Sequence, residues 1–115
     1  MSPGAEFARS APVFAALGDE TRLRLLADLA EGPRSITRLT SGGGMSRQAV
    51  TKHLHVLADA GLIRGVRRGR EQLWEVEPGS LDDARRCLDR ISAQWGVALD
   101  RLKDALARGT LGDPK

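Results

Sequence analysis

The sequence predicts a mainly α-helical domain with one β-hairpin, arranged as four helices, the hairpin and a final long helix (α-α-α-α-β-β-α). First, apolar residues recur at helical spacing before Gly61 and again after Ser80. Second, the segment between them, "LIRGVRRGREQLWEVEP", has two extended runs around "RRGR", with Leu73 and Val76 spaced for a strand. Third, 115 residues, 41% of them apolar, suffice for one domain with a modest core.

The first eleven residues show no sustained period. We interpret residues 1–11 as an N-terminal arm, either loose or partly helical, and residues 12–115 as the domain. A short helix is expected from Pro12 to a break at Gly18. Asp19 then caps a second helix, which Gly32-Pro33 ends. The apolar face of this second helix is expected to consist of Leu23, Leu26, Ala27 and Ala30.

A helix–turn–helix follows. Ser35 caps a short third helix that ends at Ser41, and Ser46 caps a fourth helix that Gly61 ends. The turn between them contains Gly42-Gly43-Gly44. Because glycine loses the most conformational freedom on ordering, we expect this turn to be mobile.

The last helix is predicted from Ser80 to about Ala107 and carries an unbroken apolar stripe. Steps of three and four residues alternate along it, which is the spacing of a coiled-coil seam. We expect a homodimer through this helix because it is longer than the domain, although a helix folded onto its own domain has the same pattern. The expected interface consists of Leu81, Ala84, Leu88, Ile91, Trp95, Ala98, Leu99 and Leu102.

The positive charge is concentrated in residues 46–70. The chain has a net charge of +3, whereas this segment carries six cations against Asp59 alone. A solvated surface usually mixes both signs, so the segment favours a polyanionic partner over a merely soluble surface.

The fourth helix offers polar side chains to such a partner. At about 100° per residue, its apolar residues fill one arc and its polar residues the opposite one. An amide such as Gln48 can pair with adenine, and Thr51 offers a hydroxyl and a methyl group to base edges. His53 lies in the apolar arc, so we expect it to be packed. The expected DNA-binding residues of this helix are Ser46, Arg47, Gln48, Thr51, Lys52 and His55.

The hairpin loop adds Arg67, Arg68 and Arg70 around Gly69. Three guanidinium groups beside a reading helix suit phosphate contact or insertion into the minor groove. A loop made soluble by arginines is the alternative.

Other functions have little support. The sequence has no Gly-rich phosphate loop, no carboxylate pair in an apolar setting and no nucleophile with a plausible base, so we expect no enzyme and no cofactor. His53 and His55 are two residues apart on a helix and cannot share one metal ion. The single cysteine, Cys87, fits a reducing compartment, and no apolar run is long enough for a membrane, so we expect a cytoplasmic protein.

Three segments, "FAALGDETRLRLLADLAEGPRSITRLT", "MSRQAVTKHLHVLADAGLI" and "GVRRGREQLWEV", resemble the ArsR/SmtB family of bacterial winged-helix repressors, from about Pro12 to Ala107. The resemblance implies a winged helix–turn–helix fold and a homodimer that binds an inverted-repeat DNA operator and blocks transcription. It also implies that Arg47, Gln48 and Thr51 lie in the major groove, with the wing alongside.

The sequence departs from the metal-sensing members of that family. Those members carry cysteines at the third helix or an acid-and-histidine set along the last helix. Here Ser35 to Ser41 contains no cysteine and Ser80 to Ala107 no histidine. The pattern is closer to members that sense no metal, some of which resemble autorepressors of a small adjacent operon.

Two alternatives remain open. One is a sensor repressor that a ligand of unknown kind, thiol oxidation at Cys87 or an unrecognised metal site releases from DNA. The other is a winged helix used only for protein interaction, which the cationic segment disfavours.

Overall fold

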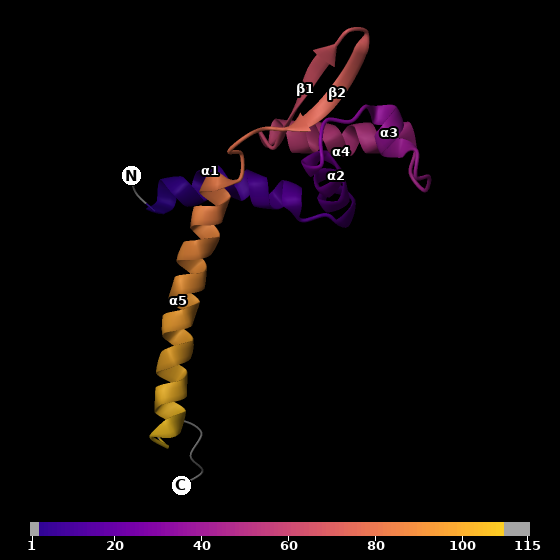
Figure 1. Cartoon of the computed structure of the whole chain (residues 1–115). Helices are drawn as coiled ribbons and strands as arrows, with labels where there is room; N and C mark the ends of the chain where they lie inside the picture. The colour runs from indigo at the N-terminus through magenta and orange to yellow at the C-terminus, as the bar shows by residue number, and fades with distance from the viewer. Residues whose placement is uncertain (1–2, 110–115) are drawn as a thin grey trace. The chain divides into compact units, whose positions relative to one another are not determined.

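The computed structural model describes residues 3–109, and their elements follow the predicted order (Figure 1). Their contacts form two compact units, divided between Ala84 and Arg85. The elements are α1 (Pro3–Leu17), α2 (Glu20–Ala30), α3 (Ile36–Thr40), α4 (Arg47–Asp59), β1 (Ile63–Arg68), β2 (Glu71–Val76) and α5 (Asp82–Ala107).

The core of the first unit is built around α4, which contacts α1, α2, α3 and β1. Side chains of α1, α2, α4 and the start of β1 meet there, and Leu54 and Leu57 of α4 are fully buried. The buried cluster consists of Val13, Ala16, Leu25, Leu29, Val50, Leu54, Leu57, Leu62, Ile63 and Ala84.

All three predicted helix caps are present. The side chains of Asp19, Ser35 and Ser46 accept hydrogen bonds from backbone N–H groups three residues further on, at 3.0–3.2 Å. Each bond satisfies a donor that the first turn of a helix leaves unpaired. The caps therefore set the beginnings of α2, α3 and α4 as the sequence predicts.

Helix α1 begins earlier than predicted, because it starts at Pro3 and continues through Pro12. We predicted a loose arm or a partial helix before residue 12 and a separate short helix from Pro12, whereas the structure has one continuous helix over the described residues. Two polar residues on this helix, Glu6 and Ser10, are buried together with Val13. Because polar residues occupy part of the buried face, the apolar spacing that usually reveals a helix is weak there.

The buried face of α2 also differs from the prediction. Leu25 and Leu29 are buried, whereas Leu23, which we assigned to the apolar face, is 50% exposed. Leucines and alanines on this helix form two overlapping stripes. Helical spacing allows either stripe to face inward, and contact with α4 selects the one with Leu25 and Leu29.

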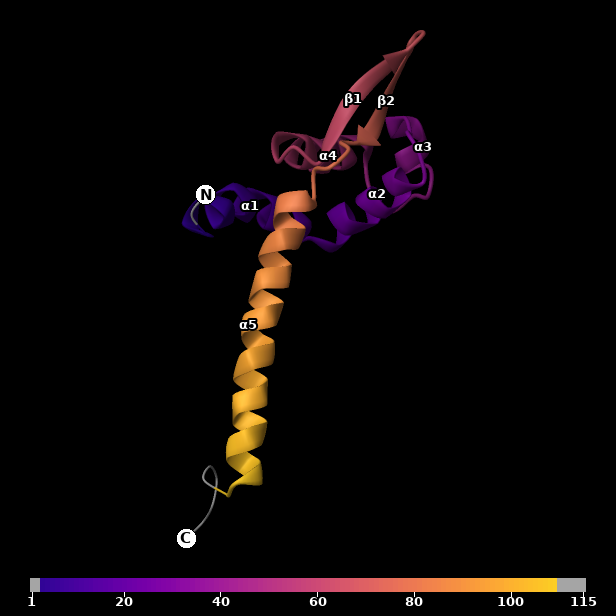
Figure 2. The same cartoon turned by 60° about the vertical axis from the view of Figure 1, so that its left-hand side comes forward.

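The wing is an antiparallel hairpin in which Ile63 pairs with Val76 and Arg68 with Glu71. Its two-residue turn is Gly69-Arg70, and Gly69 has a φ of 63°, as the first turn position of a type II′ hairpin requires. A backbone bridge joins Trp74 to Arg34 in the α2–α3 connection. Figures 1 and 2 show the hairpin extending past the helices from this attached base.

The second unit consists of α5 after its first turn. Large apolar side chains are exposed along this helix: Leu88, Ile91, Trp95, Leu99, Leu102 and Leu106 are between 39% and 65% exposed. The predicted helix is confirmed, although it begins at Asp82, two residues after Ser80. None of the helices in the described part of the chain is long and apolar enough to cross a membrane.

Candidate nucleic-acid interface

Helix α4 has one buried and one open face. Val50, Leu54 and Leu57 anchor it in the core, and Gln48, Lys52 and His55 are exposed on its other side. The predicted division of this helix into an apolar and a polar arc therefore describes its packing. Because the inner face is held by the core, the outer face presents its polar groups from a fixed backbone.

A groove of about 580 Å³ lies between α4, α3 and the wing. It brings together four residues that we predicted to bind DNA, namely three from α4 and Arg70 from the hairpin turn. The lining residues are Ser35, Ile36, Thr37, Arg47, Thr51, His55, Arg70, Glu71, Gln72 and Trp74.

The other predicted residues of α4 lie on an adjoining surface. Ser46, Gln48 and Lys52 line a shallow hollow of about 210 Å³ together with Ala49. The predicted reading set is therefore divided between two neighbouring parts of one helix. Arg47, Thr51 and His55 line the groove beside the wing, whereas Gln48 and Lys52 line the adjoining hollow.

Hydrogen bonds within the chain restrict what three of these side chains offer. The Thr51 hydroxyl donates to the Arg47 carbonyl oxygen at 2.8 Å, so its acceptor lone pairs and its methyl group remain for a partner. The Ser46 hydroxyl accepts the cap bond from Ala49 N. The Arg47 guanidinium donates to the Thr37 hydroxyl at 3.4 Å and so leans toward α3.

The three arginines of the wing lie partly on strand β1 and partly in the hairpin turn. Arg67 and Arg68 end strand β1, where they pair with Gln72 and Glu71, and Arg70 stands in the turn. We expected all three on a loop, but only Arg70 has that position. Arg67 and Arg68 are exposed on the strand, outside the groove that Arg70 lines.

Arg64 differs from the other cations of residues 46–70. Its guanidinium binds Glu75 at 2.9 Å and Glu77 at 3.3 Å. The hydrogen bond that Arg64 donates to Glu75 and the charges of both carboxylates raise the pKa of Arg64. In the part of the chain that the structure describes, Lys52, Arg67, Arg68 and Arg70 have no such carboxylate partner. The positive surface is therefore formed by fewer side chains than the sequence count implies.

Sequence reasoning did not identify Thr37, Gln72 and Trp74 as part of this surface. The Trp74 ring meets the His55 ring edge-on, with 6.2 Å between centroids and 61° between planes. Gln72 and Trp74 are two residues apart on β2 and therefore lie on the same face of the hairpin. This spacing is the sequence signal that could have identified them together. Trp74 limits the positions that the His55 imidazole can take.

No set of three or more His, Cys, Asp or Glu side chains within residues 3–109 is close enough to hold a metal ion. Cys87 is 1% exposed. The two histidines of the chain point to different partners, since His55 meets Trp74 whereas His53 meets Arg22 on α2.

The fold and this surface define a winged helix–turn–helix DNA-binding protein. A family model described as a helix-turn-helix domain matches residues 17–66. The HTH-type transcriptional regulator Rv2034 of Mycobacterium tuberculosis is 36% identical over 84 residues, 73% of this chain and 76% of that protein. The "Probable mercury resistance operon repressor" of Streptomyces lividans is 31% identical over 91 residues, 79% of this chain and 73% of that protein.

Solved structures show the same likeness. An ArsR-like transcriptional regulator from Rhodococcus sp. RHA1 is 39% identical with a TM-score of 0.72, over 85% of this chain and 92% of that one. The homodimeric winged helix-turn-helix DNA-binding domain of Mb0332 from Mycobacterium bovis is 28% identical with a TM-score of 0.62, over 82% and 88%. The chain belongs to the ArsR/SmtB family of winged helix–turn–helix transcriptional regulators, which confirms the predicted fold class and resemblance.

Proposed function

We propose that this chain is a homodimeric repressor that binds an inverted-repeat operator in bacterial cytoplasm, with α4 in the major groove and the wing against the DNA backbone. The observation that carries this proposal is the groove between α4 and the wing, where side chains suited to base edges and to phosphate lie side by side. A partner that enters this groove while touching Lys52 and the wing arginines must be complementary to the groove in shape and must carry many negative charges. Duplex DNA has both properties.

Different side chains of α4 have different tasks in this proposal. Gln48 is exposed and pairs with an adenine edge through its amide. The Thr51 methyl group contacts a thymine methyl, since its hydroxyl hydrogen is already bonded to Arg47. Lys52 and Arg47 bind phosphate or a guanine edge, and His55 adds a contact from its place against Trp74.

The wing arginines bind the DNA backbone or the minor groove. The hairpin that carries Arg67, Arg68 and Arg70 is joined to the helices of the first unit by the backbone bridge between Trp74 and Arg34. This bridge holds the hairpin in place relative to those helices. Phosphate contacts of this kind release counterions and carry no direct sequence information.

The exposed apolar stripe of α5 forms the dimer in this proposal. Its members on the helix are Leu88, Ile91, Trp95, Ala98, Leu99 and Leu102, and Leu81 directly precedes the helix. Ala84, which we also expected in the interface, is 4% exposed within the core of the first unit, so we leave it out. The homodimeric domain from Mycobacterium bovis supports a dimer. Two symmetry-related reading helices then reach major grooves about one helical turn, roughly 34 Å, apart.

Repression without a metal ion is the form of regulation that we favour. The related protein from Streptomyces lividans is named as a mercury resistance operon repressor, and mercury is a soft ion that prefers thiolates. This chain has one cysteine, Cys87, so a dimer has two at most. Control of its own gene is the simplest regulatory role for such a repressor.

Fluorescence anisotropy tests the proposal. The DNA upstream of the protein's own gene and a shuffled duplex of the same composition are each titrated over a range of salt concentrations. We expect tight binding to the upstream DNA, weaker binding to the shuffled duplex and a steep salt dependence for both. Equal, weak binding at every salt concentration, also for duplexes selected from a random library, would contradict the proposal.

A further inference from the structure

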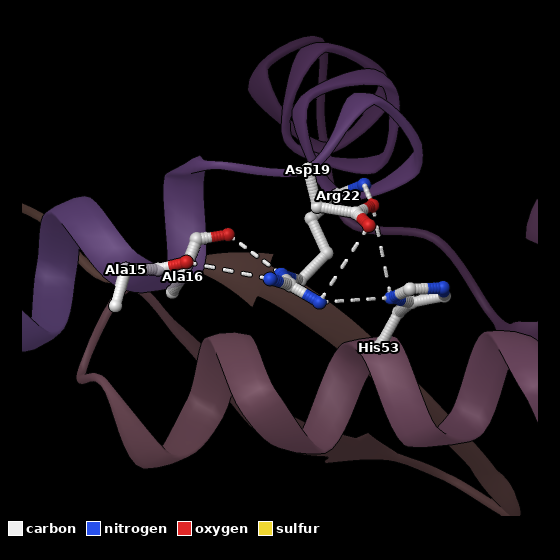
Figure 3. Close-up of polar contacts among 5 residues, drawn as sticks. All are labelled: Ala15, Ala16, Asp19, Arg22 and His53. Carbon is white, nitrogen blue, oxygen red and sulfur yellow. Dashed lines mark hydrogen bonds and ion pairs between the residues drawn. The ribbon is translucent and has the colours of Figure 1, made fainter.

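Arg22 connects three helices of the first unit through a single side chain (Figure 3). Its guanidinium donates to the carbonyl oxygens of Ala16 at 2.6 Å and Ala15 at 3.3 Å, at the end of α1. It also lies 4.0 Å from the carboxylate of Asp19, the cap of its own helix. Its remaining nitrogen is 3.2 Å from Nδ1 of His53 on α4.

The hydrogen bond between Arg22 and His53 specifies the protonation state of the imidazole. A guanidinium has only donors, so Nδ1 of His53 must accept and the ring must be neutral, with its proton on Nε2. Protonation at Nδ1 would remove the acceptor and place a second positive charge 3.2 Å from the guanidinium nitrogen. Asp19 Oδ1 is 3.9 Å from Nδ1, further away than Arg22.

This bond is directional, whereas the buried side chains that pack α4 against α1 and α2 are apolar. Leu54 and Leu57 hold α4 against its neighbours through non-directional apolar contacts, and the bond from Arg22 to His53 adds a directional restraint on the rotation of the helix. A hydrogen bond weakens steeply when its angle changes. Among residues 3–109, Arg22 to His53 is the side-chain hydrogen bond that joins α4 to α2.

We infer that Arg22, acting through neutral His53, is a positioning residue that sets the rotation of the reading helix and thereby the operator selectivity of the protein. This inference rests on the proposed function. Neither residue touches DNA, because His53 points toward α2 while Gln48 and Thr51 point away from it. A small rotation of α4 moves every base-reading side chain at once but leaves the wing arginines in place. Loss of the bond therefore reduces selectivity more than total affinity.

The charged groups around His53 are few. Helix α2 presents Asp19 and Arg22, and α1 reaches the cluster through the Ala15 and Ala16 carbonyl oxygens. On α4 itself the adjacent charged residue is the exposed Lys52. With a neutral imidazole the charges of Asp19 and Arg22 balance. With an imidazolium the cluster carries an excess positive charge, which weakens the attachment of α4.

Substitution of Arg22 by lysine tests the positioning role, because lysine keeps the charge but cannot bridge α1 and His53 with one ammonium group. The probes are a duplex that the wild-type protein selects from a random library and its shuffled counterpart, both measured by anisotropy. We expect R22K to reduce the ratio of selected to shuffled affinity about tenfold, with little change for the shuffled duplex. The matched control is R24K, since Arg24 on the same helix is exposed and its ion pair is with Glu20 of that helix, at 2.9 Å.

The pH dependence of selectivity distinguishes positioning from general stability. Histidine side chains change charge between about pH 5 and 8. Because a protonated Nδ1 can no longer accept from Arg22, we expect the wild-type selectivity ratio to fall as the pH is lowered. H53N should remove this dependence, because asparagine keeps an acceptor oxygen and does not titrate. H55N should retain it, since protonation of His55 adds a cation at the DNA surface and strengthens binding to both duplexes. Thermal melts at each pH confirm that all variants are folded.

The results separate the two levels of interpretation. If the wild type selects no sequence, the proposed function fails. The protonation state of His53 can still be tested in that case, because NMR of the ring nitrogens is measured on the DNA-free protein. A protonated Nδ1 on His53 at pH 7.5 would overturn the inference. The inference would also be overturned if R22K kept the wild-type selectivity or if H53N kept the wild-type pH dependence. In either case, selective binding by the wild type would leave the proposed function intact.

Discussion

Helices α4 and α5 both leave a face exposed, but the two faces have opposite chemistry. The outer face of α4 carries an amide, a hydroxyl, an imidazole and cations over a buried apolar side. The exposed stripe of α5 consists of leucines, Ile91 and Trp95, which is 65% exposed. A polar surface beside a cationic wing suits DNA, whereas a stripe of large apolar side chains suits burial against another protein surface. The comparison predicts that changes in α5 act through assembly and changes in α4 through base selection.

The largest effect is expected from Trp95→Ala. Buried tryptophans at interfaces contribute about 2 kcal/mol or more, so the variant should dissociate at concentrations where the wild type is dimeric, and operator binding should weaken with it. Analytical ultracentrifugation measures the dimer dissociation constant. Val97→Ala is the matched control, because Val97 is 52% exposed on the opposite side of α5 and should leave the dimer unchanged. Equal effects of the two substitutions would show that the stripe is not the interface.

The next effect concerns Gln48. Replacement by alanine should weaken binding to the operator by about 1–3 kcal/mol and relax the preference at one base pair in each half-site. Binding measured against a panel of single-base operator variants locates that position. A variant that keeps the full preference at every position would mean that Gln48 does not read bases.

A smaller and non-selective effect is expected from the wing. Arg68→Ala should weaken binding to all sequences alike and reduce the salt slope by about 0.9 for each phosphate that the variant no longer neutralises. Arg64→Ala should change the slope much less, since Glu75 and Glu77 already neutralise Arg64. Anisotropy over a salt series measures both variants. If Arg68→Ala alters the ranking of operator sequences, the wing reads bases or groove shape.

The smallest effect concerns stability at acid pH. The pKa of Asp19 is lowered from its ordinary value of 3.8, first by the hydrogen bond from Arg22 N and also by the positive charge of Arg22. A carboxylate whose pKa is lower in the folded than in the unfolded state stabilises the protein at pH values above its unfolded-state pKa. This contribution disappears as the pH falls through the folded-state pKa. Between about pH 5 and 2, the free energy of unfolding measured by chemical denaturation should therefore fall less for Asp19→Asn than for the wild type. Asparagine at this position still caps α2. Parallel curves for both proteins would exclude this role.

The sequence predicts most of this fold because its strongest signals are local. Asp19, Ser35 and Ser46 start three helices through bonds to the next turn, and Gly69 provides the backbone conformation that a two-residue hairpin needs. Such interactions depend on neighbours within a few residues and can be read along the chain. The beginning of α1 could not be read this way, because Glu6 and Ser10 interrupt the apolar spacing of its buried face.

The candidate site is only partly predictable for the same reason. The polar arc of α4 follows from its helical period. The neutralisation of Arg64 depends on the register of two strands, and the groove depends on where α3 and β2 meet α4. His53 shows the limit most clearly, since its spacing predicts a packed histidine and only the fold shows its bond to Arg22.

The sequence by itself determined the order of the helices and hairpin, the cationic segment, the polar face of α4 and the apolar stripe of α5, because periodicity, caps and turns act over one or two turns of chain. The tertiary structure alone decided which stripe of α2 is buried, which arginines keep their charge unpaired and how Arg22 joins α1 and α4. Those outcomes require residues between six and thirty-one positions apart to meet, and they depend on the packing of whole elements against one another.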